Sequence, residues 1–258
     1  LLSSIFDSSY FKYAGLEASY RPVSTLSYFA IHSVVGLDPF YYHLVSLILH
    51  TVNTLLVYQL ATFVLRQRLP ALIAGLLFAS HPVLTEAVNC IDFNDDLLMT
   101  FFFLPALISH IRSGAGRFLT NFNLYVACVV LYLLSLLSKE MAIMYPAIVL
   151  LYDLMLRDAD GDGWNLKKRF SILKSRFQFY TGLVLVSLVY LILRFGVLYN
   201  PGEASKASAG SLVERIIFLP GHILKYIVLT LYPADLNADY VYAYPGSFFD
   251  LHNLMGLL

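Results

Sequence analysis

Charged residues are scarce in this chain. Only 13% of its 258 residues are Asp, Glu, Lys or Arg, whereas an ordinary soluble domain carries roughly 25%. Hydrophobic residues make up 59%, so the chain has too little polar surface to cover a soluble globule, and the same composition excludes a disordered chain. The net charge is zero; it gives no sign of a nucleic-acid partner, and we expect none. We therefore predict an integral membrane protein whose partners include membrane lipids.

Cysteine and several catalytic motifs are also scarce or missing. Cys90 and Cys128 are too few for a disulfide framework, so we expect two reduced thiols. No Asn-x-Ser/Thr site occurs, and neither does a nucleotide-binding Gly-rich loop, a CxxC pair or an HExxH motif. The run from Asp158 to Gly163 begins like a calcium loop, but Arg169 stands where the bidentate Glu is required. A motor ATPase and a membrane zinc protease are thereby disfavoured.

Long apolar runs determine the predicted fold class. Helix is the expected conformation because a lipid-exposed open sheet cannot satisfy its backbone hydrogen bonds. We predict an all-α integral membrane protein, a polytopic helix bundle with outer-face juxtamembrane helices. Residues 1–39 form the juxtamembrane segment, and residues 40–258 form the bundle, which we expect to be incomplete at both ends. The apolar segments are 41–65, 70–85, 97–111, 122–137, 142–156, 177–198 and 216–231, with another near Leu251.

The loops between these segments alternate in charge. Basic residues follow the first, third and fifth segments, whereas the intervening loops carry acidic residues or the pair Lys139 and Glu140. Because basic loops face the cytoplasm, this pattern puts the acidic loops on the outer face. Residues 1–39 then lie outside, which implies an upstream transmembrane helix and an internal fragment. Their many aromatic residues either anchor the segment at the interface or shape a site, and the stretch from Arg21 to Gly36 is typical of an interfacial helix.

The second outer loop holds the candidate catalytic residues. Glu86, Asp92, Asp95 and Asp96 lie within eleven positions, and closely spaced carboxylates repel unless they are solvated, protonated or paired with a cation. Such groups can act as a general base or bind a divalent ion, so a divalent metal is left open. The alternative is a solvated loop in which Asp95 or Asp96 caps a helix beginning at Leu97.

Cationic side chains on the same predicted face are candidates for phosphate binding. Arg194 interrupts an apolar run near its outer end, where a guanidinium either faces an anion in the bundle or extends to the interface. Lys139 and Glu140 either contact an anionic head group or form an ordinary interfacial pair. We add Arg21 and His81 to the candidate substrate-binding residues. The histidines and the amide at positions 43, 50 and 53 share one helical face, either as a polar stripe against other helices or as metal ligands.

Several segments in order resemble a known family. They are SYRPVSTLSYFAIH, GLDPFYYHLVSLILHTVNTLLVY, FASHPVLTEAV, LLSLLSKEMAIMYPAIVLLYDL and LILRFGVL. Together, from about Phe6 to Tyr240, they resemble polytopic GT-C glycosyltransferases, in particular the protein O-mannosyltransferases and the transmembrane, tetratricopeptide-repeat O-mannosyltransferases with their bacterial relatives. Asp96 matches the acidic position of the second outer loop, Lys139 and Glu140 match an SKE segment, and Arg194 matches an arginine at a helix end. Asn94 stands where the family commonly has Arg, and Leu84 replaces a His.

The resemblance implies an inverting glycosyltransferase that takes a sugar from a polyprenyl phosphate at the outer face of the membrane. The acceptor is a hydroxyl of a protein, lipid or glycan, and no cofactor is certain. The family's base lies in a first outer acidic loop that we do not find here, and Asp7 lies too late to replace it. Two alternatives remain: a transporter or flippase for a lipid-linked or anionic substrate, and a non-catalytic scaffold. Because glycosylation sites are absent, we expect a bacterial inner membrane rather than the endoplasmic reticulum.

Overall fold

A computed structural model of the chain describes residues 10, 20–113, 122–156, 166–197, 212–234 and 236. Within these residues every regular element is a helix and no strand occurs, as predicted. The chain divides into two compact units, the first comprising Leu1–Ser80 and Ala87–Asn200, the second His81–Glu86 and Pro201–Leu258. The predicted segment near Leu251 and the stretch from Asp158 to Gly163 lie outside the described residues.

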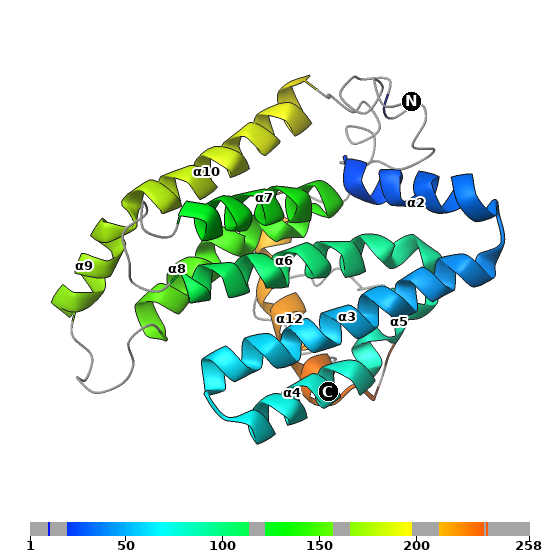
Figure 1. The fold of residues 1–258 in the computed structure, drawn as a ribbon, viewed down its shortest axis with the longest axis horizontal. Coiled ribbons are helices and arrows are strands. Elements are labelled where there is room, and N and C mark those ends of the chain that lie inside the picture. Colours follow the sequence, from blue (N-terminus) through cyan, green and yellow to red (C-terminus); the bar gives the residue numbers. More distant parts are fainter. Residues whose placement is uncertain are drawn as a thin grey trace. The chain divides into compact units, whose positions relative to one another are not determined.

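Three helices follow one another in the continuous described stretch that begins at residue 20. α2 (Pro22–Val35) covers the stretch for which an interfacial helix was predicted, and it ends at Gly36, whose φ of +69° glycine tolerates without strain. α3 (Pro39–Leu65) begins where Asp38 accepts a hydrogen bond of 3.0 Å from the backbone N–H of Phe40. α4 (Arg68–Ser80) follows after only two residues and packs against α3 (Figure 1).

Two central helices, α6 (Asn94–Arg112) and α7 (Phe122–Ser138), contribute many of the buried side chains of the first unit. They run side by side in Figure 1. α7 buries Tyr125, Cys128, Tyr132 and Leu136, each at most 1% exposed. These positions are three or four residues apart, so they form one stripe along the helix. Neither cysteine forms a disulfide, as expected.

The remaining elements complete the path of the chain. The longer helices are α8 (Tyr145–Met155), α9 (Leu166–Ser175), α10 (Phe177–Ile192) and, in the second unit, α12 (Leu212–Leu231). The short ones are η2 (Pro82–Leu84), α5 (Thr85–Asn89), η3 (Ile91–Phe93), η5 (Glu140–Met144) and the π-helical turn η6 (Leu193–Val197). α8 and α10 pack on the α6–α7 pair and enclose the core.

The polarity of α3 is reversed compared with a helix of a soluble protein. Its buried residues are Tyr42, Ser46, His50 and Asn53, whereas Leu47, Ile48 and Leu55 are more than half exposed. Polar groups inside and apolar side chains outside are what a lipid environment requires. The predicted polar stripe is confirmed for positions 50 and 53, where the side chains bond to carbonyls of α4 and α6. The prediction is wrong for His43, which is exposed.

Two helices are long and apolar enough to cross a membrane among the described residues, Pro39–Leu65 and Phe177–Phe195. A third exists if the bent pair Arg68–Ser80 and Pro82–Asn89 forms one span. The chain therefore has the character of an all-α membrane protein. Seven of the predicted hydrophobic segments coincide with helices among the described residues, but several of these helices are too short to cross a membrane by themselves. α4 has 13 residues and α8 has 11, and at about 1.5 Å per residue neither reaches the roughly 30 Å of a hydrocarbon core.

Candidate functional site

Six charged residues from four separate segments converge in the first unit. We call them the charged cluster, and its members are Arg21, Asp95, Asp96, Lys139, Glu140 and Arg194. All six are among the residues singled out in the sequence. Their contacts form a chain of alternating sign, which runs Asp96–Lys139–Asp95–Arg21–Glu140–Arg194. Three cations and three carboxylates thus balance within the cluster.

Arg21 joins the two middle carboxylates of this chain. Its Nη1 donates to Asp95 Oδ2 at 2.5 Å. Its Nε and Nη2 donate to the two oxygens of Glu140 at 3.0 and 3.1 Å. A guanidinium can make this bidentate contact and a lysine ammonium cannot. Arg21, the residue just before α2, therefore joins the first turns of α6 and η5, which lie 74 and 119 positions away in the sequence.

Asp96 is the acidic end of the cluster, and Lys139 links it to Asp95. The ammonium of Lys139 lies 2.5 Å from Asp96 Oδ2 and 3.5 Å from Asp95 Oδ2. The Asp95 side chain is 4% exposed, whereas that of Asp96 is 32% exposed. The two neighbours therefore differ in character. Asp95 lies buried between two cations, and Asp96 remains open to solvent at the edge of the cluster.

Arg194 forms the cationic end. Its Nη1 lies 3.7 Å from Glu140 Oε2 and donates to the Tyr190 hydroxyl at 3.4 Å. The arginine lies in the π-helical turn that follows α10. Such turns are rare and often lie at functional sites, because they change the direction of a side chain relative to a regular helix.

Local structure explains how the loops position these side chains. α6 begins at Asn94, three residues earlier than predicted, so Asp95 and Asp96 lie in its first turn, where the helix dipole favours anions. Asp95 Oδ1 also accepts the backbone N–H of Asp96 at 2.8 Å. Ser46 donates to Asn94 Oδ1 at 2.7 Å, which ties the start of α6 to α3. On the other side, Lys139 is the extended residue between α7 and η5.

Burial and pairing act on the pKa values of two carboxyl groups in opposite ways. Burial raises the pKa of Asp95 above its ordinary value, and Asp96 adds to this, while Lys139 and Arg21 oppose it. Burial would also raise the pKa of Glu140, but hydrogen bonds from Arg21 and the backbone, with the charges of Arg21 and Arg194, outweigh it and lower that pKa. Glu140 therefore stays ionised, and the cost of burying charge in the cluster falls on Asp95.

The other three predicted site residues are not part of these contacts. Asp92 is exposed and makes no ion pair with any described residue. Glu86 and His81 belong to the second unit. The His81 ring bonds at Nε2 to the Thr230 carbonyl at 2.9 Å and accepts the Val83 N–H at Nδ1, so both of its nitrogens are engaged. A phosphate-binding role for this histidine stays a prediction that the geometry does not support.

Tyrosines surround the cluster, and their individual roles were not foreseen from the sequence. The Tyr10 hydroxyl accepts the Arg21 backbone N–H at 3.2 Å and bonds to Thr25 at 2.6 Å. Tyr20 packs edge-on against Tyr10, with 5.1 Å between ring centroids, and burial, followed by the neighbouring phenols Tyr10 and Tyr190, raises its pKa to about 12. The aromatic residues at these positions therefore support the site. Plain interfacial anchoring does not explain them.

A second buried polar network lies at the opposite end of α6 and was missed in the sequence. His110 Nε2 bonds to Asp153 Oδ1 at 3.0 Å, and Arg176 Nη1 lies 3.6 Å from Asp153 Oδ2. Arg176 also donates to Ser113 Oγ at 2.9 Å. The sequence places Arg176 in a basic loop, but its side chain is fully buried. Tyr180, four residues after Arg176 and so on the same helical face, also donates to Asp153. This spacing of two polar side chains is the sequence signal that could have indicated a helix face turned toward the core.

The charged cluster has the chemistry of a site for an anionic substrate with a hydroxyl partner. Its acidic end could accept a proton or orient a hydroxyl, and its cationic end could contact a phosphate. Among the described residues, no group of three or more His, Cys, Asp or Glu side chains is arranged to hold a metal ion. The carboxylates of the cluster instead face Lys and Arg.

Comparisons with known proteins add independent information. The chain is 34% identical over 146 residues to human protein O-mannosyl-transferase TMTC2, an alignment covering 56% of this chain and 18% of that protein. It is 39% identical over 144 residues to mouse protein O-mannosyl-transferase TMTC1, covering 53% and 15%. It is 33% identical over 165 residues to protein O-mannosyl-transferase Tmtc3 of Drosophila melanogaster, an alignment that covers 54% of this chain and 18% of that protein.

The chain therefore spans less than a fifth of the length of these curated relatives. No family model matches it, and no solved structure matches it. The relatives come from animals, so the expectation of a bacterial inner membrane is not supported. The resemblance predicted from the sequence is confirmed: over somewhat more than half of its length, the chain is similar to the protein O-mannosyl-transferases.

Proposed function

We propose that the full-length protein is a membrane glycosyltransferase of the O-mannosyltransferase type. It would transfer a sugar from a polyprenyl phosphate to an acceptor hydroxyl, with inversion, at the outer face of the membrane. The observation that carries this proposal is the charged cluster, whose six members come from segments up to 173 positions apart in the sequence, from Arg21 to Arg194. The names of the relatives support the transferase class and a protein acceptor.

The alternating order of the cluster suggests how the work is divided. In the transfer, the acceptor oxygen attacks the anomeric carbon, the bond from that carbon to the phosphate oxygen breaks, and the polyprenyl phosphate leaves. Arg194 and Lys139 would stabilise the charge that develops on the departing phosphate. Asp96, the most exposed carboxylate of the cluster at 32%, would orient the acceptor hydroxyl. The proton goes to a carboxylate base, which the family resemblance places in another acidic loop.

The position of the cluster fits a site at a membrane face. The candidate span Phe177–Phe195 has 19 residues and is therefore about 28 Å long, close to the thickness of a hydrocarbon core. Arg194 of the cluster lies at its C-terminal end, and Arg176 of the second buried network immediately precedes its N-terminal end. With the alternating loop charges, this supports placing the cluster on the outer face, which for a protein like its animal relatives would be the lumen of the endoplasmic reticulum.

The test measures release of free polyprenyl phosphate from a panel of polyprenyl-phosphate sugars by the purified full-length protein. We expect Arg194→Gln and Lys139→Met to lower the rate by about a hundredfold or more, which is the usual effect of removing one group that stabilises a transition-state charge. Asp96→Asn should lower it as well. Arg112→Gln, an exposed basic residue at the far end of α6, is the matched control for the cations.

Asp38→Asn is the control for the acid, because asparagine caps a helix about as well as aspartate and the change removes one negative charge. Thermal unfolding of each variant separates loss of chemistry from loss of fold. Wild-type rates in folded Arg194→Gln and Lys139→Met would disprove the assigned site. Absence of release from every donor, with acceptor-containing extract present, would disprove the transferase function itself.

A further inference from the structure

Four buried polar atoms beside α3 have no hydrogen-bond partner within the part of the chain that the structure describes. They are His50 Nδ1, Asn53 Oδ1, Thr54 Oγ1 and Asn94 Nδ2. His50, Asn53 and Asn94 each use their other polar side-chain atom in a hydrogen bond. An unpaired buried polar atom is costly, and nearly all such atoms in native proteins bond to protein or to ordered water. Four of them in one region therefore need a common explanation.

These atoms lie along one face of α3. His50, Asn53 and Thr54 are three and four residues apart, so they share one turn of the helix. Asn94, at the start of α6, accepts a hydrogen bond of 2.7 Å from Ser46, which lies one turn before His50 on the same face. We call these five residues the polar seam. At 1.5 Å per residue, it extends about 12 Å along α3.

Hydrogen bonds hold the polar seam between three helices. His50 Nε2 bonds to the Ala79 carbonyl of α4 at 3.1 Å, and its ring stacks on Phe78 with 5.6 Å between centroids. Asn53 Nδ2 donates to the Leu97 carbonyl of α6 at 2.9 Å. The unbonded atoms have essentially no exposed surface. They therefore lie inside the contact of α3 with α4 and α6, away from bulk solvent and from lipid.

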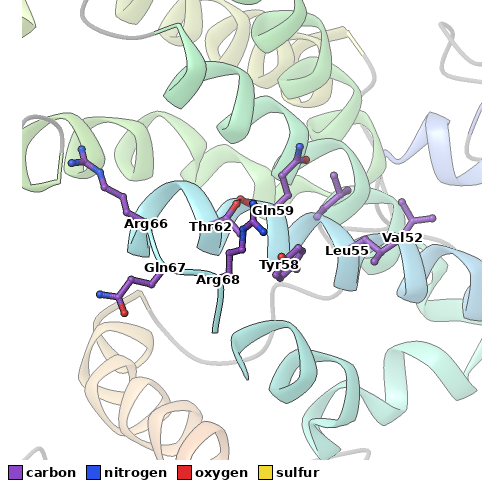
Figure 2. A pocket seen from close by; sticks show the side chains of 9 residues that line it. Val52, Leu55, Tyr58, Gln59, Thr62, Arg66, Gln67 and Arg68 are labelled. Carbon is purple, nitrogen blue, oxygen red and sulfur yellow. The ribbon is translucent and has the colours of Figure 1, made fainter. Parts of the chain in front are cut away.

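An open groove beside α3 does not supply the missing partners. It has a volume of about 690 Å³ and is lined by residues between Val52 and Arg68. Figure 2 shows Val52 and Leu55 toward one end of the row of lining side chains, and Arg66 and Gln67 toward the other. None of the described residues that line it belongs to the polar seam. Molecules in this groove therefore leave the polar seam unbonded.

The donors and acceptors of the polar seam determine which ligand fits. His50 donates from Nε2 to a carbonyl, so Nδ1 of the neutral ring is an acceptor. Asn53 Oδ1 is a second acceptor, Asn94 Nδ2 is a donor, and the Thr54 hydroxyl can be either. This uncharged mixture disfavours an ion, because a cation would face the amide N–H and an anion would face two acceptors. Water donates two hydrogen bonds and accepts two, and a buried water typically bonds to about three otherwise unpaired groups.

From these observations we infer that the polar seam binds a short row of ordered water molecules. The waters lie between α3, α4 and α6 and bond to the four unpaired atoms. One end of the row lies at Asn94, the first residue of α6, which immediately precedes Asp95 of the charged cluster. The waters thus reinforce the link between α3 and the start of α6 that Ser46 provides, and they take no part in the proposed sugar transfer.

The test combines thermal unfolding of two threonine variants of the full-length protein with a cryo-electron microscopy map that resolves ordered water. Thr54→Val keeps the shape and the β-branching of the side chain and removes only the unbonded hydroxyl. If this hydroxyl binds water, its loss removes a hydrogen bond, and we expect the unfolding temperature to fall by about 2–4 °C. Thr51→Val is the matched control, because Thr51 is exposed and its hydroxyl donates to the Leu47 carbonyl within α3. It should leave the unfolding temperature nearly unchanged.

The direction of the Thr54→Val shift distinguishes a hydrated seam from a dry one. A buried hydroxyl without a ligand destabilises the fold, so its replacement by a methyl group would raise the unfolding temperature. A rise or no change in Thr54→Val would therefore overturn the inference. The wild-type map should show density within hydrogen-bonding distance of Thr54 Oγ1 and Asn53 Oδ1. An empty seam, or a side chain from another part of the full-length protein in that place, would also overturn it.

Discussion

Replacement of Arg21 by methionine tests whether the charged cluster is one energetically coupled unit. The change keeps an unbranched side chain but removes three hydrogen bonds, one to Asp95 and two to Glu140. Asp95, at 4% exposed, then keeps one cation among the described residues, Lys139 at 3.5 Å from its Oδ2 atom, besides the backbone N–H of Asp96 at its Oδ1 atom. Breaking a fully buried ion pair by removing one partner costs about 3–5 kcal/mol, because a buried charge loses its compensation.

That figure must be reduced for solvent, because Arg21 is 19% and Glu140 29% exposed. We therefore expect Arg21→Met to lower the free energy of unfolding by about 2–4 kcal/mol. Asp95→Asn alone should cost about 1–2 kcal/mol, because the cations keep Glu140 and Asp96 as partners. The double variant should be less destabilised than the sum of the two by at least about 1 kcal/mol, since no buried carboxylate then remains without its arginine.

The assay is denaturant titration of the full-length protein in detergent, followed by near-ultraviolet circular dichroism. An unchanged slope against denaturant confirms that the variants differ in stability and not in the compactness of the unfolded state. Arg112→Met, at an exposed position, should change stability by less than about 0.5 kcal/mol. The coupling would be refuted if the losses in free energy of unfolding caused by Arg21→Met and Asp95→Asn add to that of the double variant within about 0.5 kcal/mol. A loss of less than about 0.5 kcal/mol for Arg21→Met alone would also refute it.

Three further predictions concern the loss of stability at acidic pH, the His110–Asp153–Arg176 network and the packing of α3 against α4. The pKa of Glu140 lies below its ordinary value of 4.5. Its contribution to stability is therefore present above pH 4.5 and is lost as the pH falls through the folded-state pKa. When unfolding is measured from about pH 6 downward, the free energy of unfolding should fall more steeply in the wild type than in Glu140→Gln. Arg176→Met should cost about 3–5 kcal/mol, because it leaves the fully buried Asp153 without its cation, and a cost below 1 kcal/mol in the same titration would contradict this. Gly75→Ala should lower the unfolding temperature. The gain in helix propensity of about 1 kcal/mol is outweighed by the clash of the new Cβ with Tyr58 Cβ, an atom that side-chain rotation cannot move away. An increase in the unfolding temperature would show that α3 and α4 can separate.

The sequence was sufficient to predict the helical membrane character of the chain. Low charge, long apolar runs and the backbone requirement in lipid leave helices as the expected solution, and helices occur at the predicted places. The sequence also indicated the charged residues of interest, because a charge beside an apolar run is costly unless it has a partner. Helix ends were less certain: α4 stops at Ser80, five residues before the predicted end, because His81 and Pro82 begin a separate turn.

Only the tertiary structure could decide which charges meet and how deeply each is buried. Asp95 and Asp96 are adjacent and chemically identical, yet one is 4% and the other 32% exposed, because helical geometry turns consecutive side chains about 100° apart. Arg176 looks like any residue of a basic loop until α6 and α8 are placed around it. Local pattern determines secondary structure and polarity, whereas long-range ion pairs depend on the packing of segments that are far apart in the chain.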